Sequence, residues 1–212
     1  IEQNGETEKT EKSGRSGALP WIGEGMYKMN WTAPKGYKRA VLVFDGAMSQ
    51  PVVTVNGKEA GKWAYGYNAF RIDITPFIQF GKKNLIEVHL NNVEESSRWY
   101  PGGGLYRPVS VELYGNENFS SWDTFVRTLK ADKQEAEVEV NALLEGKTGK
   151  SGKTIIALLD EAGKKVAEQT VSGATPAVKT TLKVANPQLW SPESPYLYQV
   201  KLTRYEGKKV AD

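Results

Sequence analysis

Hydrophobic and polar residues alternate with a period of two along most of the chain. Phe70, Ile72 and Ile74 alternate with polar residues, which is typical of a strand with one buried face. Residues 41–44 are apolar on both faces and predict a central strand. Turn residues separate such runs at short intervals, and Asn56-Gly57 is the strongest hairpin signal. The pattern therefore predicts an all-β chain of many short strands, as in a β-sandwich or jelly roll.

Changes in this pattern divide the chain into three parts. Residues 1–18 are polar, charged and rich in glycine, without periodicity, and predict a disordered or extended N-terminal arm. Aromatic residues become rarer after Gly115-Asn116, and the alternating runs become longer. We therefore expect one domain over residues 19–115 and a second over residues 116–212.

The second domain has the pattern of an immunoglobulin-like sandwich. Residues 135–142 predict a half-exposed strand, and the continuously apolar residues 154–160 predict a central one. Four more runs, at 121–129, 166–171, 178–184 and 196–205, bring the number to six of the seven strands that such a sandwich needs. We expect the last strand to be missing, so that one edge of residues 197–205 has no partner.

Composition narrows the classes of function. The 28 basic and 25 acidic residues give a net charge of +3 and are mixed along the sequence, so no basic block predicts nucleic-acid binding. No apolar run is long enough to span a membrane. The absence of cysteine and the presence of a single histidine, His89, leave little material for a transition-metal site. His89 lies in an alternating run, where we expect a structural role.

The most informative segment is an aromatic sequence that leads into a glycine turn. Arg98, Trp99 and Tyr100 precede Gly102-Gly103-Gly104, and an alternating strand follows at residues 109–113. Trp and Tyr offer flat apolar faces with a polar group, which suits sugars. The alternative is an ordinary hairpin whose aromatic side chains pack on the edge of a sandwich.

This segment also carries a family resemblance. Ser97-Arg98-Trp99-Tyr100, the small-residue turn and Tyr106-Arg107 resemble the signature at the end of the first domain in glycoside hydrolase family 2. That family contains β-galactosidases, β-glucuronidases and β-mannosidases. Further motifs follow the family's order, at residues 25–28, 43–46, 53–58, 65–75 and 84–88, and residues 186–198 resemble a loop of its second domain.

The resemblance implies a galactose-binding-like jelly roll followed by an incomplete immunoglobulin-like sandwich. These would form an N-terminal fragment of a retaining, β-galactosidase-like enzyme that hydrolyses terminal β-glycosidic bonds. It places both catalytic glutamates on a (β/α)8 barrel, so we expect no catalytic residue, metal or cofactor in this chain. Arg98, Trp99 and Tyr100 become the candidate substrate-binding rim.

Two residues outside the rim receive structural assignments. Asn116-Glu117 mimics the Asn-Glu dipeptide that carries the family's acid/base, but it lies between two β domains, so we expect Glu117 to belong to a linker. Trp190 lies in the proline-rich loop, and its large apolar area predicts a side chain that plugs the core.

The expected partner is a carbohydrate, bound through the catalytic domain, with neither nucleic acid nor membrane and with homo-oligomerisation left open. Two alternatives remain, a free-standing pair of carbohydrate-binding modules and a purely structural pair of β domains. The lack of cysteine fits a reducing compartment and equally many exported bacterial proteins. A periplasmic or extracellular location is our working expectation.

Overall fold

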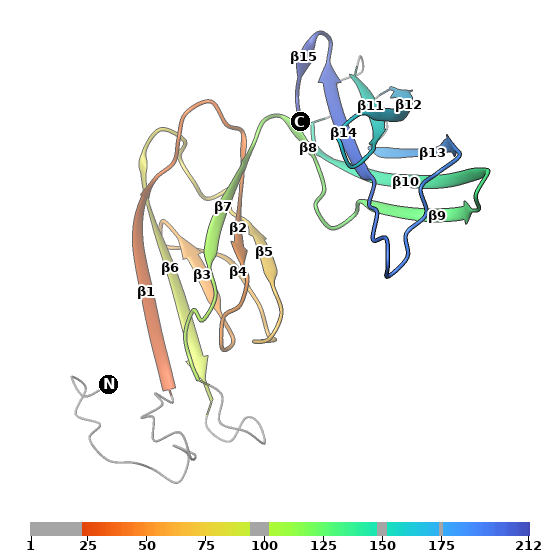
Figure 1. The fold of residues 1–212 in the computed structure, drawn as a ribbon. Helices are drawn as coiled ribbons and strands as arrows, with labels where there is room; N and C mark the ends of the chain where they lie inside the picture. The colour runs from red at the N-terminus through yellow and green to blue at the C-terminus, as the bar shows by residue number, and fades with distance from the viewer. Residues whose placement is uncertain (1–22, 94–101, 148–151, 174–175) are drawn as a thin grey trace, which may run out of the picture. The chain divides into compact units, whose positions relative to one another are not determined.

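The computed structural model describes residues 23–93, 102–147, 152–173 and 176–212 (Figure 1). The all-β prediction is confirmed, because secondary structure in these ranges consists of strands and turns. None of the described ranges contains a helix capable of crossing a bilayer. The chain divides into two compact units, Ile1–Leu113 and Tyr114–Asp212, which are described separately.

The first unit contains two antiparallel sheets. Their strands are β1 (Gly23–Thr32), β2 (Arg39–Phe44), β3 (Val52–Val55), β4 (Lys58–Lys62), β5 (Phe70–Asp73), β6 (Lys83–Asn92) and β7 (Val109–Tyr114). One sheet has the order β1-β6-β3-β4 and the other β5-β2-β7, so β1, β4, β5 and β7 are edge strands. Residues 41–44 lie in β2, between two neighbours, and the prediction of a central strand is confirmed.

The core of the first unit lies between these sheets and is built around stacked aromatic rings. Phe44 and Phe70 stack with their ring centroids 4.6 Å apart, and Trp63 stacks on Phe70 at 5.5 Å. The alternation of Phe70, Ile72 and Ile74 places all three side chains in this core, as predicted. Offset aromatic stacking adds to the free energy that burial of these apolar surfaces supplies.

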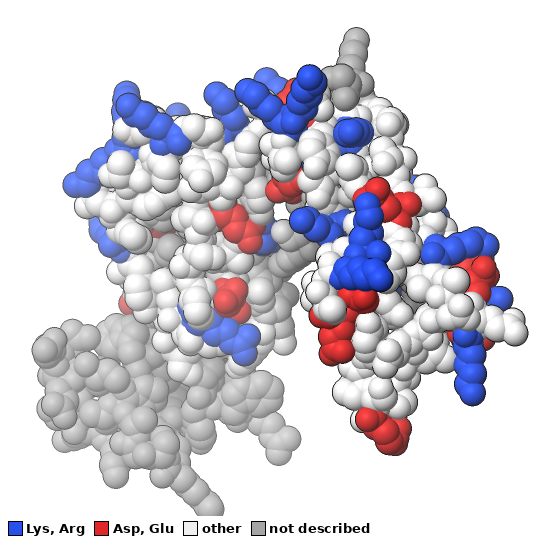
Figure 2. Space-filling view, turned by 45° about the horizontal axis from the view of Figure 1, so that its top comes forward, with Lys and Arg blue, Asp and Glu red and all other residues white. Residues whose placement is uncertain are grey.

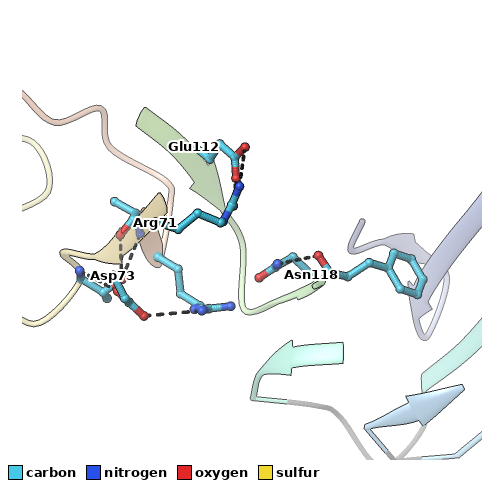
Figure 3. A network of polar contacts seen from close by, with 8 residues as sticks. Arg71, Asp73, Glu112 and Asn118 are labelled. Atoms are coloured by element: carbon cyan, nitrogen blue, oxygen red, sulfur yellow. Dashed lines mark hydrogen bonds and ion pairs between the residues drawn. The ribbon is translucent and has the colours of Figure 1, made fainter. Parts of the chain in front are cut away.

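Polar contacts hold the outer face of the β5-β2-β7 sheet (Figure 3). Arg71 on β5 forms a two-pronged ion pair with Glu112 on β7, across the intervening strand β2. Asp73 accepts a hydrogen bond from the backbone N–H of Thr75 at 2.9 Å and lies 3.5 Å from an Arg39 guanidinium nitrogen. These contacts connect all three strands of the sheet.

The predicted hairpin at Asn56-Gly57 is confirmed. It joins β3 to β4, and both of its residues have positive φ, 51° for Asn56 and 76° for Gly57. This is the backbone conformation that a type I′ hairpin turn requires. Asn56 also donates hydrogen bonds of 2.9 Å to the carbonyl of Phe77 and to the side-chain oxygen of Asn84, which fixes the turn against its neighbours.

The second unit is also a sandwich of two sheets. Its strands are β8 (Glu117–Phe119), β9 (Phe125–Ala131), β10 (Glu135–Gly146), β11 (Gly152–Leu159), β12 (Lys165–Ser172), β13 (Ala177–Ala185), β14 (Gln199–Glu206) and β15 (Lys209–Val210). One sheet has the order β13-β10-β8 with β9 also paired to β10, and the other has the order β12-β11-β14-β15. The six predicted strands correspond to β9–β14, and the two short strands β8 and β15 are additional to them.

The expectation of an open edge on β14 holds only in part, and the expectation for Trp190 was wrong. The edge of β14 is not open along its whole length, because Tyr205 and Glu206 pair with β15. Trp190 does not plug the core, since 57% of its surface is exposed. Its loop, residues 186–198, also exposes Leu189 and Leu197, and the core is filled instead by strand residues such as Ile156 and Leu182.

Candidate functional site

The predicted substrate rim, Arg98, Trp99 and Tyr100, lies outside the described residues. Its immediate surroundings are described, because the chain is placed up to Val93 and again from Gly102. The candidate site therefore consists of the residues on either side of this segment and the elements that hold them.

Both sides of the segment are hydrogen-bonded to one short stretch, Met48-Ser49. On the first side, the N–H of Asn91 donates to the carbonyl of Ser49 at 2.9 Å, and the Ser49 hydroxyl donates to the carbonyl of Asn91 at 2.5 Å. On the second side, Gly104 and Met48 exchange backbone hydrogen bonds of 2.7 and 2.9 Å. The two flanks are thus anchored to one common support.

Glycine is required next to this support. A β-carbon on Gly103 would lie 3.0 Å from the β-carbon of Asn92, so Asn92 would have to shift by a few tenths of an ångström. Gly104 has a φ of 120°, which side chains rarely permit, and a β-carbon there would lie 2.8 Å from the Tyr27 hydroxyl. The close approach of the two flanks therefore depends on the glycine turn that the sequence analysis singled out.

Tyr106 extends the support to a third loop. Its hydroxyl donates a 2.7 Å hydrogen bond to the carbonyl of Gly66, and its ring lies across Gly46, where a β-carbon would come within 2.5 Å of it. The guanidinium of Arg107 lies 5.6 Å from the ring centroid, a cation–π distance. The Tyr106-Arg107 pair of the motif thus has a positioning role in the described structure.

Exposed tyrosines gather around the same loop. Tyr65 and Tyr67 flank Gly66, and their ring centroids are 5.6 Å apart. Both side chains are exposed, as is Tyr106. Sequence reasoning did not select Tyr65 and Tyr67 as site residues, although the aromatic pattern Tyr-Gly-Tyr was visible. The arrangement provides flat apolar faces with hydroxyl groups, chemistry that suits a carbohydrate.

Glu117, expected in a linker, lies instead in β8 and is fully buried. Its Oε1 accepts a hydrogen bond of 3.1 Å from the Nε of Arg204, whose side chain is 1% exposed. The expectation of a linker is corrected because this carboxylate has a buried charged partner on a distant strand. Its burial also separates it from any substrate in solution.

His89 lies on the outer face of the β1-β6-β3-β4 sheet, with its Nε2 3.3 Å from a Glu24 carboxylate oxygen. Across the four described ranges, no group of three His, Cys, Asp or Glu side chains is arranged to hold a metal ion. The outer face of this sheet also carries an ion pair of 2.8 Å between Lys28 and Glu87. The hydrogen bond from Lys28 lowers the pKa of Glu87.

Cross-strand ion pairs connect β10 and β13 of the second unit. Basic and acidic side chains lie side by side on the surface of the molecule (Figure 2). Lys183 lies 2.7 Å from Glu137, and Lys179 lies 3.0 Å from Glu139. The hydrogen bond from Lys183 lowers the pKa of Glu137, and hydrogen bonds from Lys179 and Asn141 lower the pKa of Glu139. These carboxylates stabilise the sheet in their ionised form.

Comparison with known proteins gives consistent matches. The model of the family "Glycosyl hydrolases family 2" matches residues 120–212. A putative β-glucuronidase of Formosa agariphila is 35% identical over 94% of the chain and 19% of its own length. A β-galactosidase of Bacteroides ovatus is 34% identical over 86% of the chain and 22% of its own length. The chain thus spans about a fifth of these two relatives.

Comparison with solved structures also matches the chain to glycoside hydrolases. A family 2 glycosyl hydrolase of Bacteroides cellulosilyticus matches with a TM-score of 0.79 and 33% identity, over 91% of this chain and 28% of its own. A putative β-galactosidase of Bacteroides fragilis matches with a TM-score of 0.80 and 26% identity, over 91% of this chain and 32% of its own. Both matches extend across the two units of the fold.

Proposed function

We propose that this chain, which belongs to glycosyl hydrolase family 2, provides non-catalytic β domains of a retaining β-glycosidase. In this proposal the protein hydrolyses terminal β-glycosidic bonds, in β-galactosides or β-glucuronides, at a catalytic barrel outside residues 1–212. The first domain supports that barrel and contributes Arg98, Trp99 and Tyr100 to the rim of the substrate pocket.

The burial of Glu117 carries the non-catalytic part of the proposal. Retaining glycosidases need two carboxyl groups about 5–5.5 Å apart that both reach the substrate. Asn116-Glu117 is the only Asn-Glu dipeptide in the sequence, and its carboxylate is enclosed and paired with Arg204. The two catalytic carboxylates would therefore come from another part of the protein.

The hydrogen bonds that anchor both flanks of the rim segment support its role at a substrate pocket. Its flanks are hydrogen-bonded to Met48-Ser49, and Tyr106 connects the same region to Gly66. Flanks that are fixed before binding reduce the conformational entropy that the segment between them loses when it binds a ligand. The exposed aromatic rings of Tyr65, Tyr67 and Tyr106 offer additional surface for a sugar.

Sequencing the natural gene on both sides of the codons for residues 1–212 tests this proposal. A barrel encoded after Asp212, with two inward-facing glutamates whose replacement by glutamine abolishes hydrolysis, would support the proposal. A stop codon directly after Asp212 would overturn it and favour the free-standing pair of carbohydrate-binding modules. Assays with aryl β-galactoside and aryl β-glucuronide then identify the sugar.

A further inference from the structure

We propose that a hollow on the first unit, lined by residues other than the three rim candidates, binds a sugar residue that carries a carboxylate, such as a uronic acid. The hollow has a volume of about 500 Å³ and is lined by Gln50, Val52, Lys62, Trp63, Ala64 and Tyr65. This volume is within the range of small-molecule sites. The inference rests on the proposed function for one point only, that the ligand is a glycan.

The side chains that line the hollow supply three complementary chemistries. Tyr65 is 59% exposed and presents a ring face against which the apolar side of a sugar can pack. The amide of Gln50 can donate to and accept from hydroxyl groups. Lys62 adds an ammonium group. In the part of the chain that the structure describes, neither Gln50 nor Lys62 makes a side-chain hydrogen bond or ion pair.

The charge of the lining selects the ligand. Lys62 is the only charged residue among the six that line the hollow, and none of the six is acidic. A neutral sugar offers the ammonium group only uncharged oxygen acceptors, whereas a carboxylate accepts its hydrogen bond and forms an ion pair with it, which is the stronger contact. A uronic acid residue has both the apolar ring face that Tyr65 suits and the carboxylate that Lys62 suits.

The walls of the hollow are fixed before any ligand binds. Val52 on β3 pairs with Lys62 on β4, and the N–H of Trp63 donates to the carbonyl of Pro51 at 3.0 Å. The indole of Trp63 stacks on Phe70 and donates from Nε1 to the side-chain oxygen of Asn68 at 2.9 Å. The backbone of the site and Trp63 therefore need no reordering on binding, and the entropy cost is confined to exposed side chains such as Lys62 and Gln50.

Titration of the 212-residue chain with methyl β-glucuronide and with methyl β-glucoside tests the inference. The two probes differ only at C6, which is a carboxylate in the glucuronide and a hydroxymethyl group in the glucoside. Binding is followed by NMR through the backbone amides of Gln50, Val52, Lys62 and Ala64. We expect the glucuronide to bind roughly two- to fivefold more tightly, the gain that one exposed ion pair gives. Lys62→Met should remove this preference, and Lys62→Arg should keep it.

Two matched controls separate the site from general effects. Lys58→Met removes an exposed lysine from the other end of β4, and Tyr37→Ala removes an exposed tyrosine that does not line the hollow. Both should leave the two affinities unchanged, whereas Tyr65→Ala should weaken both probes. Equal affinity for the two probes, no shift at the four amides, or a preference that survives Lys62→Met would overturn the inference. These results are independent of the reading frame, so a failure here is distinguishable from a failure of the proposed function.

Discussion

Arg204 Nε lies 3.1 Å from Glu117 Oε1, and both side chains are enclosed in the second unit. The same guanidinium donates to the carbonyl of Gly173 at 3.2 Å and lies 3.4 Å from the hydroxyl of Thr154. This single side chain therefore connects β8, β11 and β14 with the turn after β12. A buried charge of this kind is tolerated because its partners replace the water that it has lost.

Removal of one partner should show how much the second unit depends on this pair. Arg204→Met leaves the Glu117 carboxylate buried without its counterion, and we expect a loss of about 3–5 kcal/mol in the free energy of unfolding of this unit. Urea unfolding, followed by NMR signals of β10 and β11, measures it. Arg127→Met is the control, because the Arg127 side chain is 69% exposed beside Glu139 and its loss should cost about 1 kcal/mol or less.

A double variant identifies the cause of that loss. Glu117→Leu combined with Arg204→Met removes both charges, and it should recover much of the stability if the unpaired carboxylate is responsible. Similar losses for Arg204→Met and Arg127→Met would contradict the importance assigned to the buried pair.

Replacement of Gly152 by alanine should destabilise the second unit because the added β-carbon would clash with Arg204. A β-carbon at residue 152 would lie 2.0 Å from Nη2 of the guanidinium, so Gly152→Ala must displace a buried charged group. We expect a cost of about 1–3 kcal/mol in the second unit, and a smaller cost when Arg204 is already methionine. Gly25→Ala is the matched control, since nothing lies within 4 Å of a β-carbon there. A cost for Gly152→Ala that is unchanged in the Arg204→Met background would disprove the clash.

The strands could be predicted from the sequence because their signals are local. Alternation at Phe70, Ile72 and Ile74 indicates a strand with one buried face, and Asn56-Gly57 indicates a hairpin turn with positive φ. Glu117 could not be interpreted in this way. Its partner Arg204 lies 87 residues further along the sequence, and no local sequence pattern predicts an ion pair between residues so far apart in the chain. Trp190 was misplaced because apolar area alone does not reveal whether another part of the fold covers it.

The hollow on the first unit could not be predicted from the sequence, because it depends on the exact pairing register of β3 and β4. Counted from the Asn56-Gly57 turn without a bulge, Gly61 would lie opposite Val52. The pairing shifts between Val53 and Thr54, so that Lys62 takes this position instead. A shift of one residue moves a side chain to the other face of a sheet. The sequence showed the hairpin but not the bulge, and therefore not that Gln50 and Lys62 line one hollow.

Alanine variants of Arg98, Trp99 and Tyr100 test the rim assignment. If these side chains contact substrate and not the core, each variant should leave the melting temperature of this chain almost unchanged. The same changes in the complete enzyme should lower kcat/KM. Phe44→Ala is the reference for a core residue, because Phe44 is fully buried and its loss should cost about 3–5 kcal/mol. A comparable loss for Trp99→Ala would defeat the assignment of Trp99 to the rim.

The second unit should lose stability in acid. Because the folded-state pKa values of Glu137 and Glu139 are lowered by their lysine partners, these residues stabilise the fold above their unfolded pKa, about 4.3. That contribution disappears as the pH falls from about 5 through the folded pKa values, when the carboxylates become protonated. Unfolding measured between pH 7 and pH 3 should show the decline, and Glu137→Gln should make it shallower. An identical pH profile for this variant would contradict the role of the pair.

The two sides of β14 should differ in hydrogen exchange. Along its whole length β14 pairs with β11, but on its other side the C-terminal residues 209–212 reach only Arg204, Tyr205 and Glu206. Alternate amides within residues 199–203 therefore point away from β11, to a side where the described strands offer no ladder partner. We expect these amides to exchange much faster than those of residues 41–44 in β2, which has a neighbour on each side. Strong protection that appears only at high protein concentration would mean that another molecule adds a strand there, as exposed edges permit. Equally strong protection of both sides in a dilute monomer would show that this edge is already covered, contrary to the pairing described.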